Sequence, residues 1–226
     1  MTQGRPNSDT RPVVAVLARA PAAGRVKTRL VPRLGAERAA ELHLRMMHHT
    51  LATVALSRVG PVELWCGADG DLSALEACRR KLGVPLHMQP DGDLGQRMSA
   101  IAAQVLSRAN RLIMVGTDAP SMTPGDITEA ARALAEGHDA VVGPAEDGGY
   151  YLIGLNRHAP DVFDGIDWGT PAVLMQTRVR LLGLQWRTHE LPLRWDVDTP
   201  GDYDRLRADR QLSFLTEYLE AAASAQ

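Results

Sequence analysis

The chain has 226 residues, which is enough for one large α/β domain with a substantial hydrophobic core. Its formal net charge is −2 and its pI is near 6.4, so composition gives no reason to expect nucleic acid or an anionic membrane as a partner. The two cysteines have no metal-binding spacing and form no disulfide framework, which predicts a reducing, cytoplasmic location.

Residues 1–11 are polar and lack the apolar core of a secretory signal, so we expect a flexible tail followed by a single domain over residues 12–226. No apolar run approaches the length of a membrane span. Short apolar runs alternate with helical periodicities, which predicts βαβ units and a parallel sheet. We expect strands at 13–18, 62–66, 86–89, 112–115, 139–143, 150–155 and 184–191, and helices at 35–57, 71–82, 93–107, 123–136, 170–182 and from 199.

The first strand is followed by a basic loop, residues 19–30, which contains Gly24. Backbone N–H groups around this glycine and several positive side chains could together bind a diphosphate or a triphosphate. The spacing matches neither a Walker motif nor a dinucleotide fingerprint. A solvated basic loop is the alternative. The four cations of the loop are Arg19, Arg25, Lys27 and Arg29.

Three histidines, His43, His48 and His49, lie on the expected helix 35–57. They do not have the spacing of a two-histidine metal pair with a third ligand in view. We therefore expect them on the surface of this helix.

The segment 89–98 begins another expected helix. Gly95 would allow the backbone to approach a flat ligand, and Asp93 can cap the helix. Arg97 lies in the first turn, where a cation opposes the helix dipole. Its position is explained either by a bound nucleotide or by an ion pair with Asp91 or Asp93.

Asp118 follows the apolar run 112–115, at the carboxyl end of a strand buried on both faces. Open α/β sheets bind ligands at this edge, so the carboxylate would project into a crevice. A lone carboxylate there indicates a metal or a phosphate-rich substrate. The alternative is a turn-forming aspartate before Pro120.

Further acidic residues follow later strands. Glu146 and Asp147 come after strand 139–143 and would enter the same crevice, although Asp147-Gly148-Gly149 also fits a hairpin turn. Asp196 and Asp198 alternate on an extended segment, so both can point to one side. Trp168 is expected either to form a wall of an acceptor pocket or to fix a loop.

Five segments together resemble a GT-A-like glycosyltransferase family that includes a proposed arsenosugar-biosynthesis glycosyltransferase. They are 18–30, 92–98, 116–120, 143–155 and 196–202, which cover nearly the whole chain. That family belongs to the nucleotide-diphospho-sugar transferase superfamily, whose relatives include the molybdenum cofactor and 2-phospho-L-lactate guanylyltransferases. The resemblance implies a single Rossmann-like GT-A domain with a mostly parallel central sheet and helices on both faces.

The resemblance also implies roles for residues of this chain. A divalent cation, Mg²⁺ or Mn²⁺, would bind Asp118 together with Asp198 or Asp196. Phosphate and nucleotide contacts would come from Arg19, Gly24, Lys27, Arg29, Gly95 and Arg97. The side of the acceptor would comprise Glu146, Asp147, Gly148, Gly149 and Trp168.

Three activities fit this set of residues. The first, which the family favours, is transfer of a sugar from a nucleotide-sugar to a small-molecule acceptor, with Asp147 or Glu146 as base. The second is nucleotidyl transfer from a nucleoside triphosphate with release of pyrophosphate. Asp118 is followed by Ala119 and Pro120, and this single-aspartate form is more like the nucleotidyltransferases. The third is a catalytically silent nucleotide-binding protein on the same fold.

Overall fold

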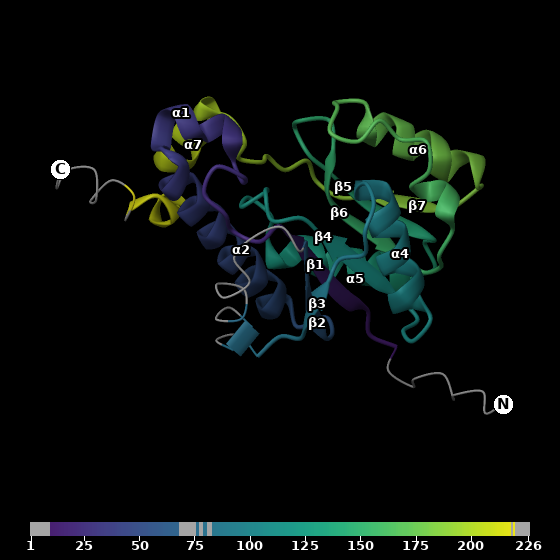
Figure 1. Ribbon diagram of the computed structural model, residues 1–226. Helices are drawn as coiled ribbons and strands as arrows, with labels where there is room; N and C mark the ends of the chain where they lie inside the picture. Colours follow the sequence, from purple (N-terminus) through teal and green to yellow (C-terminus); the bar gives the residue numbers. More distant parts are fainter. Residues whose placement is uncertain (1–9, 68–75, 77–78, 81–82, 218, 220–226) are drawn as a thin grey trace.

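A seven-stranded sheet forms the centre of the structure, a computed structural model that describes residues 10–67, 76, 79–80, 83–217 and 219 (Figure 1). The strand order is β3-β2-β1-β4-β6-β5-β7. Neighbouring strands pair in parallel, except that β6 runs antiparallel to both β4 and β5. This confirms the predicted α/β fold with a mostly parallel sheet. The strands are β1 (Val13–Ala18), β2 (Val62–Cys66), β3 (Leu86–Met88), β4 (Leu112–Val115), β5 (Ala140–Pro144), β6 (Tyr150–Leu155) and β7 (Thr188–Glu190).

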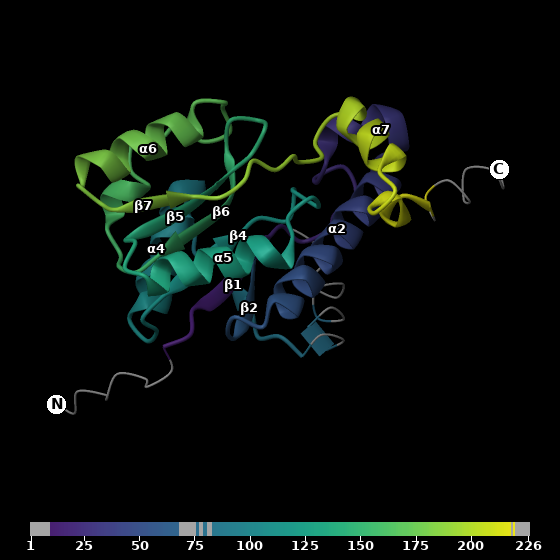
Figure 2. The same cartoon turned by 180° about the vertical axis from the view of Figure 1, so that it is seen from behind.

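Helices cover both faces of the sheet, as predicted (Figures 1 and 2). Successive side chains of a strand point to opposite faces. Val14 and Val16 of β1 therefore pack with α2 and α5, whereas Val13 and Ala15 pack with α4 and α6. The helices are α1 (Val31–Leu34), α2 (Ala36–Ser57), α4 (Leu94–Leu106), α5 (Pro124–Ala135), α6 (Val173–Gly183) and α7 (Pro200–Ala208), with 3₁₀ turns η1 (Thr28–Leu30), η2 (Pro160–Val162) and η3 (Ser213–Leu215).

Local signals fix where several helices begin. Asp93, Thr123 and Thr199 each cap a helix, and each forms a capping box with the residue three positions later. These caps confirm the predicted starts of α4, α5 and α7. No helix in the described part of the chain is both long and apolar enough to cross a bilayer.

Three expectations differ from the structure or lie outside it. The strand predicted at 184–191 is shorter, because α6 continues to Gly183 and Gln185 then adopts a left-handed conformation. Two short helices, η1 and α1, follow the basic loop and were not predicted. Most of the predicted helix 71–82 lies outside the described residues. The first nine residues of the predicted tail lie wholly outside them.

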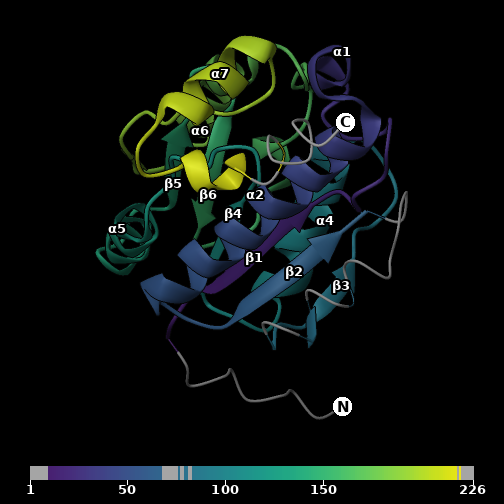
Figure 3. The ribbon, with the colours of Figure 1, turned by 90° about the vertical axis from the view of Figure 1, so that its left-hand side faces the viewer.

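A third hydrophobic cluster lies between the first half of α2, α7 and η3. Figure 3 shows α1, the beginning of α2 and α7 together at the top of the view. Two of its fully buried members, Leu30 and Val197, belong to segments far apart in the chain. Leu30 directly follows Arg29, and Val197 lies between Asp196 and Asp198. Packing in this cluster therefore brings the basic loop and the late acidic segment together.

Two leucines of α2 offer a direct test of this cluster. Leu42 is completely buried in it, whereas Leu56 on the same helix is 68% exposed. We expect Leu42→Ala to lower the free energy of unfolding by about 2–5 kcal/mol, because the substitution leaves a cavity. Urea unfolding measures the effect, and Leu56→Ala, the matched control, should change stability by less than about 0.5 kcal/mol. Equal losses of unfolding free energy in the two variants would contradict a stabilising role for the third cluster.

Candidate active site

The basic loop and two acidic segments surround a cavity of about 280 Å³ at the carboxyl ends of β1 and β4. Of the predicted site residues, the structure brings five together there: Arg19, Lys27, Arg29, Asp118 and Asp198. Arg25, Val26, Thr28 and His43 complete the lining.

Lys27 lies at the centre of this arrangement. Its side chain is only 3% exposed, and its ammonium group donates to a carboxylate oxygen of Asp118. The same nitrogen donates to the backbone carbonyl of Val197 at 2.7 Å and lies 3.8 Å from Oδ1 of Asp198. One buried cation therefore joins the basic loop to both acidic segments.

The backbone directs Lys27 inward. This residue has a φ of 48°, a left-handed conformation that costs a non-glycine residue about 1–2 kcal/mol. The turn is closed by a hydrogen bond from the Leu30 amide to the Lys27 carbonyl, 2.8 Å long, and Leu30 is fully buried. Packing and ion pairing compensate for the strain at this position, as is common in functional sites.

Asp118 is held on both its backbone and its side chain. Its carbonyl accepts a hydrogen bond of 2.9 Å from the amide of Val197, which fixes the β4 loop against the late acidic segment. Desolvation opposes ionisation of the carboxyl, but the attraction of the Lys27 ammonium is stronger in sum, so the pKa of Asp118 lies below its usual value. The carboxylate is therefore ionised at neutral pH.

Asp198, rather than Asp196, faces the cavity. Its carboxylate accepts from Nη1 of Arg29 at 2.8 Å, and its backbone amide donates to Asp202 in the first turn of α7. Asp196 lies outside the lining, near Asp147, and burial together with that neighbouring negative charge raises the pKa of Asp196 to about 6.

The donor set at the cavity fits a hard divalent cation that binds with its substrate. Asp118 and Asp198 both line the cavity and carry carboxylate oxygens, and Mg²⁺ commonly binds one or two carboxylates plus substrate phosphates. Within the described ranges, no group of three or more His, Cys, Asp or Glu side chains could hold a metal ion by itself. The chemistry of these donors thus suits a metal whose shell is completed by phosphate oxygens.

The predicted nucleotide contacts of the β3 side lie apart from this cavity. Arg97 donates to the side chain of Gln89 over 3.4 Å, and Gln89 in turn donates to the carbonyls of Ala18 and Trp65. The guanidinium is thereby held at the ends of β1 and β2. Gly95 is buried, and a Cβ there would lie 2.3 Å from Nε1 of Trp168. Its observed contact is with the protein.

The hairpin and the acidic loop turn out to be one feature. Strands β5 and β6 are antiparallel neighbours, and Gly148, with a φ of 87°, turns the chain between them. Asp147 accepts from the amide of Gly149 at 2.8 Å. Glu146 points instead to Arg205 of α7, with an N–O distance of 2.6 Å. Two of the predicted acceptor residues therefore have different partners: Asp147 stays within the hairpin turn, whereas Glu146 pairs with α7.

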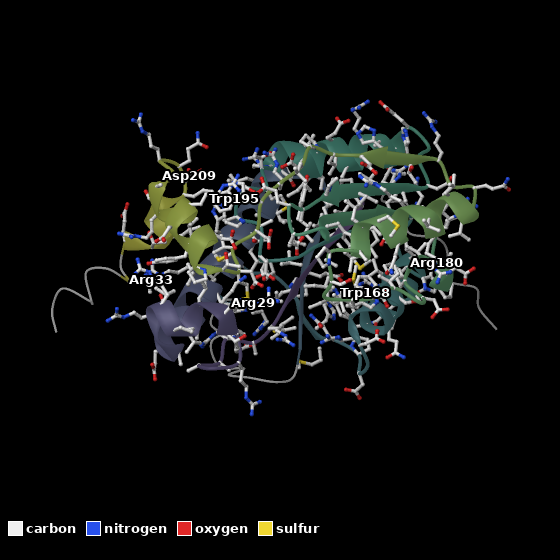
Figure 4. The ribbon with its side chains drawn as sticks, turned by 90° about the horizontal axis from the view of Figure 1, so that it is seen from above. Arg29, Arg33, Trp168, Arg180, Trp195 and Asp209 are labelled. Carbon is white, nitrogen blue, oxygen red and sulfur yellow. The ribbon has the colours of Figure 1, made fainter. Side chains whose placement is uncertain are left out.

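Trp168 lies on the α6 side of the molecule, whereas Arg29 and Trp195 lie on the side of α1 and α7 (Figure 4). Its ring meets that of Tyr150 edge to face, with centroids 6.2 Å apart. Trp168 thus contacts the first residue of β6 as well as Gly95, and it is separate from the cavity lining.

Sequence reasoning placed His43 on the helix surface, and this was wrong. The side chain is buried and lines the cavity. A signal was present, because His43 shares the apolar stripe of Ala39, Met46 and Met47 on α2. Arg25 was noted only as part of the basic loop, and its position in the lining required the folded backbone.

Comparison with known proteins identifies the family and the fold of this chain. Residues 50–170 match the family described as "Uncharacterized protein conserved in bacteria (DUF2064)". A phosphoenolpyruvate guanylyltransferase of Rhodococcus erythropolis is 32% identical over 202 residues, covering 80% of this chain and 84% of that protein. A solved structure from Desulfovibrio desulfuricans, described as a candidate nucleotide-diphospho-sugar transferase, has 30% identity, a TM-score of 0.81 and 95% coverage of both chains.

A cytidylyltransferase of Leptospira borgpetersenii shares the fold at 14% identity, with a TM-score of 0.61 and 96% coverage of both chains. The fold and the site thus define a transferase of the nucleotide-diphospho-sugar transferase superfamily. Within it, the chain belongs to the bacterial DUF2064 family. The predicted relationship to guanylyltransferases and the prediction of a transferase are both confirmed.

Asp196 gives the stability of the protein a pH dependence that can be tested in buffer containing a chelator. Its pKa in the folded chain, about 6, exceeds the usual 3.8, so its ionised form costs stability above pH 6, and this cost disappears as the pH falls below 4. We expect Asp196→Asn to stabilise the protein at pH 8 by about 1 kcal/mol, but not at pH 4. Urea unfolding at the two pH values measures this difference.

The control is Asp164→Asn, which removes one negative charge from an exposed loop position. It should alter stability by less than about 0.5 kcal/mol at either pH. A gain from Asp196→Asn that is equally large at pH 4 would show that its cause is not the ionisation of this carboxyl group.

Proposed function

We propose that this protein is a metal-dependent nucleotidyltransferase. An oxygen atom of a small-molecule acceptor attacks the α-phosphorus of a nucleoside triphosphate, a new oxygen–phosphorus bond forms, and the bond to the departing pyrophosphate breaks. The observation that carries the proposal is the convergence of four cations and two carboxylates on one cavity.

The charges of the lining favour a triphosphate. Arg19 and Arg25 are exposed at the cavity, whereas Lys27 is buried beside Asp118. Guanidinium groups bind phosphate oxygens with paired N–H donors, and their charge does not titrate. The guanylyltransferase relative, which shares 32% identity over most of its length, supports the same reaction class.

Residues of the site would act mainly by positioning and charge. Arg19, Arg25 and Arg29 would bind the phosphates, while Lys27 would neutralise charge that develops on the leaving pyrophosphate. Asp118 and Asp198 would hold Mg²⁺ or Mn²⁺, which when bound supplies further neutralisation of phosphate charge.

On the β6 side, Asp147 would accept the proton of an acceptor hydroxyl if the acceptor carries one. Asp147 is exposed at the hairpin turn, and its carboxylate keeps one hydrogen bond to Gly149. Arg97, at the ends of β1 and β2, would contact the nucleoside from the other side.

Sugar transfer from a nucleotide-sugar remains a second candidate. The observation that favours it is the Desulfovibrio structure, which aligns with 95% of this chain and is described as a candidate nucleotide-diphospho-sugar transferase. Both reactions would use the same cations and metal ligands, but they release different products.

The products separate the two reactions. We expect incubation with Mg²⁺, a panel of labelled nucleoside triphosphates, and small phosphorylated acids that include phosphoenolpyruvate to release pyrophosphate only when an acceptor is present. Chromatography measures pyrophosphate and the nucleotidylated acceptor in equal amounts. A parallel panel of nucleotide-sugars is the control. Release of nucleoside diphosphate from that panel alone would contradict nucleotidyl transfer and support sugar transfer.

Arg25 tests the preference for a triphosphate. It is exposed, so Arg25→Met should fold normally, and we expect about ten-fold weaker binding of a non-hydrolysable triphosphate, because a charge-assisted hydrogen bond is lost. Binding of the monophosphate should change by less than about two-fold. Calorimetry measures both affinities. Arg33→Met, on exposed α1 and outside the lining, is the matched control and should leave both affinities unchanged.

A further inference from the structure

Two histidines of α2 reach the two loops that form the cavity. Nε2 of His43 lies 3.0 Å from the backbone carbonyl of Arg19, at the start of the basic loop. Nε2 of His49 lies 3.0 Å from the carbonyl of Pro120, in the turn that follows Asp118. A carbonyl oxygen only accepts, so both rings donate an N–H from Nε2. One helix thus contacts both loops through the same type of hydrogen bond.

His43 is buried to 96% and lines the cavity itself. Burial lowers the pKa of His43 despite its bond to the Arg19 carbonyl and the nearby Asp118 carboxylate, so the ring is neutral at pH 7. A neutral imidazole has a single N–H, and the Arg19 carbonyl places it on Nε2. The backbone carbonyl of Arg19, the first residue of the basic loop, is therefore oriented by a side chain of α2.

His49 also packs against the C-terminal region. Its ring meets that of Phe214 edge to face, with centroids 5.7 Å apart and an interplanar angle of 64°. The ring orientation that this contact favours also directs Nε2 to Pro120. A side chain whose rotamer is fixed by packing positions its partner at low entropic cost.

We propose that His43 and His49 are positioning residues, which hold the basic loop and the Asp118 loop at the spacing that Lys27 and Asp118 need. The loops carry opposite charges, and neither has a regular ladder of backbone hydrogen bonds to the other. Helix α2 contacts both loops, and it therefore contributes to their relative position together with the pairing of β1 with β4 and the contact of Lys27 with Asp118. The effect of the two histidines on nucleotide binding rests on the proposed function. Their effect on the position of the loops is independent of the reaction.

The alternative is that the two rings merely fill space against α2. The N–H donor of each ring distinguishes the packing role from the positioning role, because only positioning requires a hydrogen bond. Leucine occupies similar space without a donor, whereas the amide nitrogen of glutamine can reach the position of histidine Nε2. A packing role predicts that glutamine harms the protein at least as much as leucine, and a positioning role predicts that glutamine restores the loop.

Hydrogen exchange on the free protein tests the proposal. In the basic loop, the amides of Arg25 and Leu30 are hydrogen-bonded within the loop, and so is the amide of Met122 after Asp118. We expect His43→Leu to accelerate exchange over 22–30 by about ten-fold, and His49→Leu to accelerate it over 119–122 by a similar factor, with the central strands unchanged. His43→Gln and His49→Gln should return each segment to within about two-fold of the wild-type rate.

Nucleotide binding gives the second readout. Calorimetry with a non-hydrolysable triphosphate should show about ten-fold weaker binding by His43→Leu and recovery in His43→Gln, because misplaced loop groups lose their phosphate contacts. Leu56→Ala, at an exposed position of the same helix, is the control, and its affinity should equal that of the wild type. Unchanged exchange in both leucine variants, or equal acceleration in the leucine and glutamine variants, would overturn the proposal.

Two further outcomes keep the tests separate. If the wild type binds no nucleotide, the proposed function fails, but the exchange rates still decide the positioning role. If a leucine variant does not fold, the ¹⁵N chemical shifts of the imidazole nitrogens in the wild type decide instead. Protonation of Nε2 in both rings supports the proposal, and protonation of Nδ1 alone in either ring overturns it.

Discussion

The ammonium group of Lys27 is the interaction on which the site depends. It is buried, and it contacts the Asp118 carboxylate, the Val197 carbonyl and, at longer range, Asp198. A buried cation is costly unless charged and polar partners surround it. The three partners come from two separate segments, so their relative position is constrained by the need to solvate one charge. Electrostatics and fold are therefore inseparable at this point of the molecule.

The rest of the architecture supplies the rigid parts that this interaction needs. The parallel strands β1 and β4 deliver the two loops to the same edge of the sheet. The third hydrophobic cluster holds Leu30 and Val197, the neighbours of the charged residues, away from water. Capping boxes at Thr123 and Thr199 start α5 and α7 directly after the β4 loop and the late acidic segment. Apolar packing thus positions charges that would not hold a fixed geometry by themselves.

Much of this arrangement could be predicted because its causes are local. Strand periodicity and capping residues depend on neighbours in sequence, and the rule that ligands bind at strand ends placed Asp118 at the correct edge. The direct contact of Lys27 with Asp118 could not be predicted, since it joins residues 91 positions apart. His43 was wrongly predicted to lie on the helix surface because its polar side chain was given more weight than its position in the apolar stripe of α2. The loop at 145–149 was described by two alternatives: the structure has the hairpin turn, whereas neither Glu146 nor Asp147 belongs to the lining of the cavity that contains Asp118.

The contact between Lys27 and Val197 also has a consequence for the order of events during synthesis. These residues are separated by 170 positions, so the buried ammonium acquires its full set of partners only after most of the chain has left the ribosome. Contacts of such long range form late, because the entropy of closing a large loop must be paid first. In a nascent chain that contains β1, β4 and the basic loop but lacks the segment around Val197, water would take the place of the Val197 carbonyl beside the Lys27 ammonium. The environment that buries Lys27 is therefore completed late in synthesis, when the segment around Val197 packs against the first loop.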